Sequence, residues 1–174
     1  MFSARGSRLF LPVILIASGL ACTVAFAPRL FGGQQPDSAI IAEGGGTTII
    51  QGGTGTPGFV PVLTKIGFHA ERTGAGVTGN FECLALAPES TTGAGSGQFT
   101  INAMYVTGNI AGGTVSEGTA TLNGTANVTG LGAGSNEPFT FVVQGGGPGA
   151  TSVLSVSGLT FHEVLLDGSF RVAE

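Results

Sequence analysis

The chain has 174 residues, of which 9% are charged and 32 are glycine, and its net charge is −4. An average soluble protein carries roughly 25% charged residues, so this composition excludes the kind of disorder that high net charge drives. Only six residues are basic, which excludes a patch that neutralises several phosphates, and we therefore expect no nucleic-acid partner.

Residues 1–27 have the layout of a secretory signal peptide. Two arginines precede an apolar run over 9–20, and Ala25-Phe26-Ala27 offers a cleavage site between small residues. One alternative is an uncleaved anchor, because the segment is nearly long enough to cross a bilayer. Another is a lipoprotein modified at Cys22. Each alternative predicts export to the cell surface or beyond, with no other membrane span in the chain.

Residues 28–58 are predicted to be a flexible linker. Glycines cluster at 44–46 and 52–55, and prolines accompany them, a composition that resists packing. Two short apolar pieces interrupt this segment, and one of them, 47–50, is an option for an edge strand. The folded domain is therefore expected to span 59–174.

From residue 60 onward, apolar and polar residues alternate, as they do in strands that bury one face. The pattern is clearest at 119–129, where one side carries Ala120, Leu122, Gly124, Ala126 and Val128. It predicts short strands at about 60–72, 77–87, 98–107, 110–116, 119–129, 139–143, 152–159, 161–166 and 169–172. Turns every eight to twelve residues indicate a small antiparallel all-β domain, a β-sandwich or barrel of seven to nine strands.

Two dipeptides in this part of the chain are hairpin signals. Asp167-Gly168 is expected to join the last two strands. Asn123-Gly124 would split 119–129 into two strands, but Gly124 keeps the apolar parity, which favours one unbroken strand. Longer loops are expected at 88–97 and 131–138.

The expected core contains seven phenylalanines and the thiol of Cys83. Cys83 shares its parity with Phe81 and Ala85, which predicts a buried, unreactive side chain, and the alternative is a reactive or intermolecular thiol. In 98–107, one side carries Phe99, Ile101, Ala103 and Tyr105. The phenylalanines expected in the core are Phe68, Phe81, Phe99, Phe139, Phe141, Phe161 and Phe170.

The sequence shows no set of residues that predicts catalysis or a cofactor. A G-x-G-x-x-G pattern at 53–58 is followed by prolines rather than by the helix that a dinucleotide site needs. No spacing favours a carboxylate pair among Glu71, Glu82, Glu163 and Asp167 for glycoside hydrolysis. The protein is therefore expected not to be an enzyme.

Histidine–acid pairs occur at two places, His69 with Glu71 and His162 with its neighbour. If the first and last strands close a barrel, His69, Glu71 and His162 could converge to hold a divalent metal. The alternative is that all three are solvent-facing polar residues, because a metal site needs converging geometry as well as suitable ligands.

Several segments occur in an order that is typical of a known module. They are Gly67-Phe68-His69-Ala70-Glu71-Arg72, Val77-Thr78-Gly79-Asn80-Phe81, Thr119-Ala120-Thr121-Leu122-Asn123-Gly124-Thr125, Phe139-Thr140-Phe141-Val142-Val143 and Pro148-Gly149. Over about 59–172 the chain resembles the post-COAP domain, a Gly/Thr-rich all-β module of large bacterial secreted and surface proteins. The resemblance implies an extracellular module without an established activity, and it supplies no functional residues.

These observations predict a secreted or cell-surface, non-enzymatic β module of structural or adhesion type. Its partner would be a polysaccharide or a surface protein, bound weakly through Thr/Asn-rich strand faces and the loops 88–97 and 131–138. The alternative function is a small-ligand or metal-binding β-barrel that uses His69, Glu71 and His162.

Overall fold

The strands form one antiparallel sheet whose first and last members pair with each other. The computed structural model describes residues 39–51, 62–89 and 98–173. The expected signal peptide at 1–27, the glycine pattern at 53–58 and most of the 88–97 loop lie outside them. The strands are β1 (Ala39–Ile50), β2 (Leu63–Thr73), β3 (Gly76–Pro88), β4 (Phe99–Ser116), β5 (Thr119–Gly130), β6 (Gly134–Gln144), β7 (Thr151–Val156) and β8 (Leu159–Val172).

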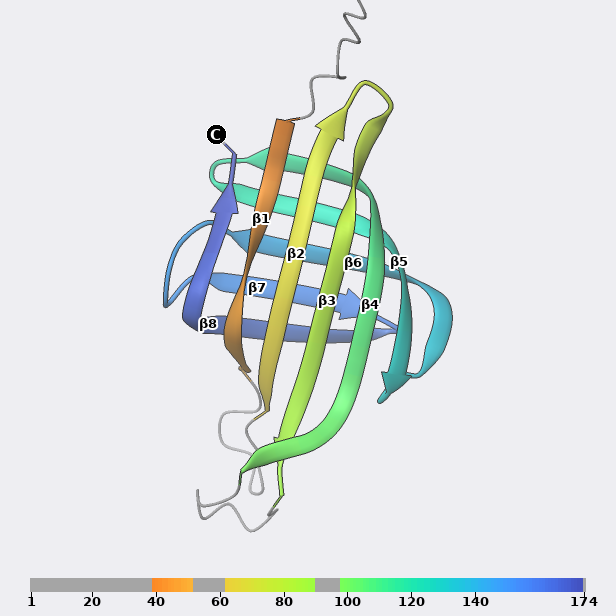
Figure 1. Cartoon of the computed structure of the whole chain (residues 1–174), viewed down its shortest axis with the longest axis vertical. Coiled ribbons are helices and arrows are strands. Elements are labelled where there is room, and N and C mark those ends of the chain that lie inside the picture. The colour runs from red at the N-terminus through yellow and green to blue at the C-terminus, as the bar shows by residue number, and fades with distance from the viewer. Residues whose placement is uncertain (1–38, 52–61, 90–97, 174) are drawn as a thin grey trace, which may run out of the picture. The chain divides into compact units, whose positions relative to one another are not determined.

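Each strand pairs with its neighbours in sequence, and β8 pairs with β1 to close the barrel (Figure 1). The predicted class, an all-β sandwich or barrel, is therefore confirmed. Within the described ranges, no helix reaches the length and hydrophobicity of a membrane-spanning segment.

The closed sheet is arranged as two crossing layers. β1, β2, β3 and the first part of β4 run side by side, and β6, β7 and the first part of β8 cross behind them at a large angle (Figure 1). β4, β5 and β8 bend to pass from one layer to the other. Extra residues break the ladder at Ala111 in β4 and at Leu166 in β8. Such bulges are how strands turn the corners of a closed sheet.

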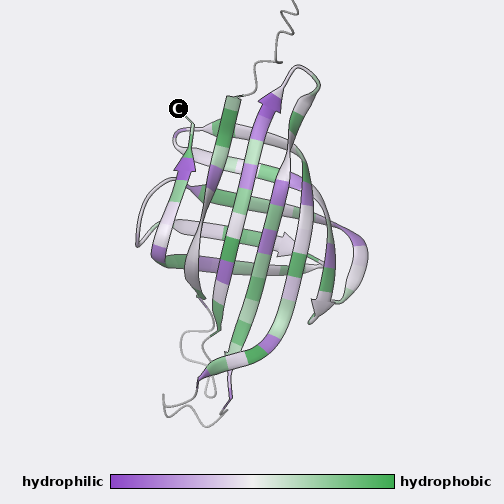
Figure 2. Ribbon diagram, viewed as in Figure 1, coloured by the Kyte–Doolittle hydropathy of each residue, from purple (hydrophilic) through white to green (hydrophobic). Residues whose placement is uncertain are grey.

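The core lies between the layers and follows the alternation of the sequence. Figure 2 shows hydrophobic and hydrophilic residues alternating along β2 and β3. Five phenylalanine rings meet at centroid distances of 4.8 to 5.6 Å, and Cys83 is buried as expected. Phe99 and Phe161, also expected in the core, are only half-buried. The five rings are those of Phe68, Phe81, Phe139, Phe141 and Phe170.

The predicted linker at 28–58 is wrong for 39–50, because these residues form β1 and so belong to the folded domain that was expected to start at 59. The glycines at 44–46 allow β1 to approach the backbones of β2 and β8 closely, because they carry no Cβ atom. A Cβ atom on Gly46 would overlap the carbonyl oxygen of Asp167. A glycine cluster thus marks a close approach between strands here, not flexibility.

The predicted hairpin at Asp167-Gly168 is also wrong, because β8 runs through it without a break. Gly168 has a φ of 107°, which bends the strand, and a Cβ there would overlap the carbonyl oxygen of Gly45. Similarly, 98–107 and 110–116 join into β4, and most of the expected loop at 131–138 belongs to β6. The strand expected at 119–129 is confirmed as the unbroken β5.

Substitution of Gly46 by Ala tests the close approach between β1 and β8. We expect Gly46→Ala to lower the free energy of unfolding by about 1–3 kcal/mol, because the added methyl group must displace backbone. The measurement is urea unfolding followed by circular dichroism. The matched control is Gly67→Ala in β2, where a Cβ would meet no atom within 4 Å. Equal effects of the two substitutions would contradict this packing.

Candidate functional site

The outer face of β2, β3 and β4 carries a hollow where one strand lacks a side chain. Gly67 follows Ile66 and precedes Phe68, both of which are buried, so its own position faces outward. Lys65 and His69 occupy the next outward positions along β2. Because Gly67 has no side chain between them, a depression opens over the middle of the sheet.

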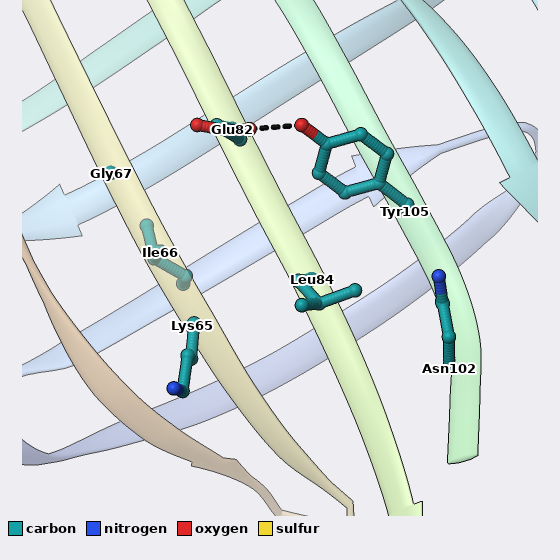
Figure 3. A pocket seen from close by; sticks show the side chains of 7 residues that line it. All are labelled: Lys65, Ile66, Gly67, Glu82, Leu84, Asn102 and Tyr105. Atoms are coloured by element: carbon teal, nitrogen blue, oxygen red, sulfur yellow. Dashed lines mark hydrogen bonds between the residues drawn. The ribbon is translucent and has the colours of Figure 1, made fainter. Parts of the chain in front are cut away.

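Two shallow grooves meet at this depression and share Gly67 and Glu82. Their volumes are about 560 Å³ and 530 Å³. The first is lined by Lys65, Ile66, Gly67, Glu82, Leu84, Asn102 and Tyr105 (Figure 3). The second is lined by Gly67, Phe68, His69, Asn80, Phe81, Glu82, Thr107, Gly108 and Asn109. We call their combined surface, which crosses three strands, the outer groove.

One hydrogen bond fixes the aromatic ring of the outer groove. The hydroxyl of Tyr105 on β4 donates to Oε1 of Glu82 on β3 (Figure 3). This bond raises the pKa of Tyr105, and partial burial and the carboxylate charge add to the effect. The ring, which belongs to the only tyrosine in the chain, is held beside Leu84 and Asn102.

The outer groove mixes polar and apolar surface, and its charges nearly balance. Lys65 and Glu82 bring opposite charges to the first groove. Asn80, Asn102 and Asn109 contribute amides, each of which offers two donors and an acceptor. The surface is therefore suited to an uncharged ligand that is rich in hydroxyl groups.

His69, one of the predicted metal ligands, lies at the edge of the outer groove. Its Nδ1 is 3.5 Å from Oε2 of Glu43 on β1, and Oε1 of Glu43 accepts a hydrogen bond of 2.8 Å from Arg171 on β8. These contacts cross the junction where β8, β1 and β2 meet. They are solvent-exposed, so each contributes little to stability.

The structure does not bring His69, Glu71 and His162 together. Glu71 lies opposite Ile40 and Thr78, and His162 lies opposite Val153 on β7. Although β1 joins β2 to β8 as a closed barrel requires, His69 lies opposite Glu43 of β1, whereas His162 lies beside Gln51, just past the end of β1. In the part of the chain that the structure describes, no three His, Cys, Asp or Glu residues are placed to hold a metal ion.

The outer groove was not predicted because the wrong side of β4 was expected to face the core. Met104, Val106 and Ile110 of β4 point into the core, so Tyr105 and Asn109 face outward. Near Phe99 the apolar residues stand at positions 99, 101 and 103, but an extra residue at Ala103 shifts the register with β3, so the other parity faces inward further along the strand. The only usable signal was the run of alternating Met104, Val106 and Ile110 further along the strand.

Known proteins offer no residues to transfer to the outer groove. Comparisons of the chain with protein families, curated proteins and solved structures found no match. The resemblance to the post-COAP domain therefore stays a prediction, and the chemistry of the groove follows from its own side chains.

A zinc titration tests whether the predicted metal ligands act together. Because His69, Glu71 and His162 lie apart, we expect stoichiometric zinc to leave the melting temperature unchanged, in the wild type and in His69→Ala alike. Metal that binds only the folded state would raise the melting temperature. A rise that His69→Ala and His162→Ala both abolish would contradict the geometry described above. Differential scanning fluorimetry is the measurement.

Proposed function

We propose that the protein is a secreted or cell-surface, non-enzymatic β module that binds an uncharged polysaccharide along the outer groove. The observation that carries this proposal is the open groove of mixed polar and apolar surface across β2, β3 and β4, with amide side chains and one tyrosine ring on its walls. The signal-like layout of residues 1–27 supports export.

The groove chemistry matches the chemistry of a sugar chain. Sugar hydroxyls both donate and accept hydrogen bonds, and so do the amides of Asn80, Asn102 and Asn109. Tyr105 has an apolar ring and a polar tip, so its ring can cover the C–H face of a sugar while its hydroxyl stays bonded to Glu82.

The shape of the groove favours a polymer over an enclosed small molecule. The two grooves continue into each other at Gly67 and are shallow and open to solvent. A chain of sugar units can lie across both grooves, whereas a single small molecule would remain largely exposed to solvent. Hydrogen bonds made in competition with water contribute only about 0.5–1.5 kcal/mol each, so binding by one module is expected to be weak.

The groove is better suited to binding than to hydrolysis. Cleavage of a glycosidic bond generally uses two carboxyl groups that face each other across the bond. Among the described residues that line the groove, Glu82 is the only acid, and its Oε1 accepts the bond from Tyr105.

Titration with uncharged oligosaccharides tests this function. We expect cello-, chito- or β-glucan oligosaccharides to bind, and Tyr105→Ala to weaken that binding at least about tenfold, since the ring and its bonded hydroxyl are both lost. A second variant, Gly67→Leu, fills the hollow and is expected to block binding without touching the core. Isothermal titration calorimetry with the soluble oligosaccharides is the measurement.

The matched control is His162→Ala, an exposed residue outside the outer groove. It is expected to bind each oligosaccharide as the wild type does. The proposal fails if none of these sugars binds at millimolar concentration, or if His162→Ala lowers the affinity as much as Tyr105→Ala does.

A further inference from the structure

A carboxyl group lies inside the barrel, on the opposite side of the sheet from the outer groove. Glu163 of β8 is 1% exposed. Its Oε2 accepts hydrogen bonds from the hydroxyls of Thr48 on β1 and Thr64 on β2, the latter at 2.6 Å. The two threonines are opposite each other in the β1–β2 ladder, so two neighbouring strands hold this oxygen of β8.

The other carboxyl oxygen, Oε1, has no hydrogen-bond partner among the described residues. The same holds for Oγ of Ser152, which is 2% exposed and lies opposite Glu163 in the β7–β8 ladder. Paired residues of an antiparallel ladder have Cβ atoms about 4.5–5.5 Å apart. Because buried polar atoms are nearly always bonded, two such oxygens on adjacent strands point to a shared hydrogen-bonding molecule.

The surroundings of these two oxygens are otherwise apolar. Phe161, the next inward-facing residue of β8, and Val62, the equivalent residue before β2, are half-buried and pack against the core. Cys83 is also close, and its pKa is raised by its own burial and by the charge of Glu163. A molecule that binds here therefore needs an apolar body as well as a polar group.

The electrostatics favour a neutral molecule. Burial raises the pKa of Glu163, although the bonds from Thr48 and Thr64 oppose the shift. The flanking basic residues give no compensation, because Lys65 and His162 are exposed on the outer face. With Oε2 already accepting two bonds, Oε1 is the carboxyl oxygen that is left available to a ligand.

We propose that the barrel interior between Glu163 and Ser152 binds a small neutral molecule that carries a hydroxyl group on an apolar body. The ligand hydroxyl donates a hydrogen bond to Glu163 Oε1, and its oxygen accepts a hydrogen bond from the hydroxyl of Ser152. A hydroxyl is the smallest group that does both. This site is separate from the outer groove and does not rest on the proposed polysaccharide binding.

Phenol and toluene are matched probes, because they differ by the hydroxyl group. We expect phenol to shift the backbone amide resonances of residues 152 and 163 saturably, with a dissociation constant below about 10 mM. Toluene, which leaves both oxygens unbonded, should bind at least about fivefold more weakly. The measurement is a ¹H–¹⁵N correlation titration of the whole chain.

Ser152→Ala removes one side of the site without removing any bond that the structure contains. It should weaken phenol binding about 3- to 10-fold, the range expected for one hydrogen bond. The matched control is Ser155→Ala on the same strand, whose hydroxyl bonds Thr160 at 3.1 Å on the other face. This control should bind phenol as the wild type does.

The proposal is overturned if phenol causes no saturable shift, which would mean that water alone satisfies the two oxygens. It is also overturned if toluene binds as tightly as phenol, or if Ser155→Ala weakens phenol binding as much as Ser152→Ala does. Glu163→Leu provides an independent check, since it should abolish the preference for phenol over toluene.

Discussion

Antiparallel pairing between β1 and β8 is the constraint on which the rest of the structure depends. It turns an open eight-stranded sheet into a closed one and so removes both edges. The pairing is possible because glycines at 44–46 and at Gly168 let the two backbones approach where side chains would collide. The same closure brings Thr48, Thr64 and Glu163 together, since they come from β1, β2 and β8. A glycine-rich composition usually suggests flexibility, but in this chain the glycines of β1 and β8 allow the barrel to close.

Closure also divides the polar chemistry of the chain between two faces of one sheet. On β2, Thr64 points inward to the buried acid, whereas its neighbour Lys65 lines the outer groove. The inner cluster is buried, its polar groups are few, and hydrogen bonds hold one oxygen of Glu163. The outer groove is broad and open to solvent, and it presents amide side chains and the ring of Tyr105 across three strands. The two faces are therefore suited to different ligands, a small neutral molecule inside and a sugar chain outside.

Sequence alternation predicted those strands that bury a single, consistent face. β5 followed this rule along its whole length, so 119–129 was assigned correctly. β1 was missed because glycine has no side chain to show a parity. Tyr105 was placed on the wrong side because it continues the parity of the apolar residues at 99, 101 and 103, whereas an extra residue at Ala103 breaks the pairing of β4 with β3. The outer groove and the Glu163 cluster were beyond prediction, since each depends on the register between strands that are distant in sequence. The same lack of register information explains why the sequence suggested a metal site from His69 and His162, which the strand pairing keeps apart.

Native-state hydrogen exchange of the backbone amides tests the closure most directly. If β1 and β8 pair as described, amides in 43–48 and 164–171 that lie within the ladder should exchange as slowly as those at the centre of β3 and β5, because they open only with global unfolding. Rapid exchange of 39–50, beside slow exchange in β3 and β5, would show that the first strand is not part of the folded barrel. That result would contradict the closed sheet and the buried cluster around Glu163 together.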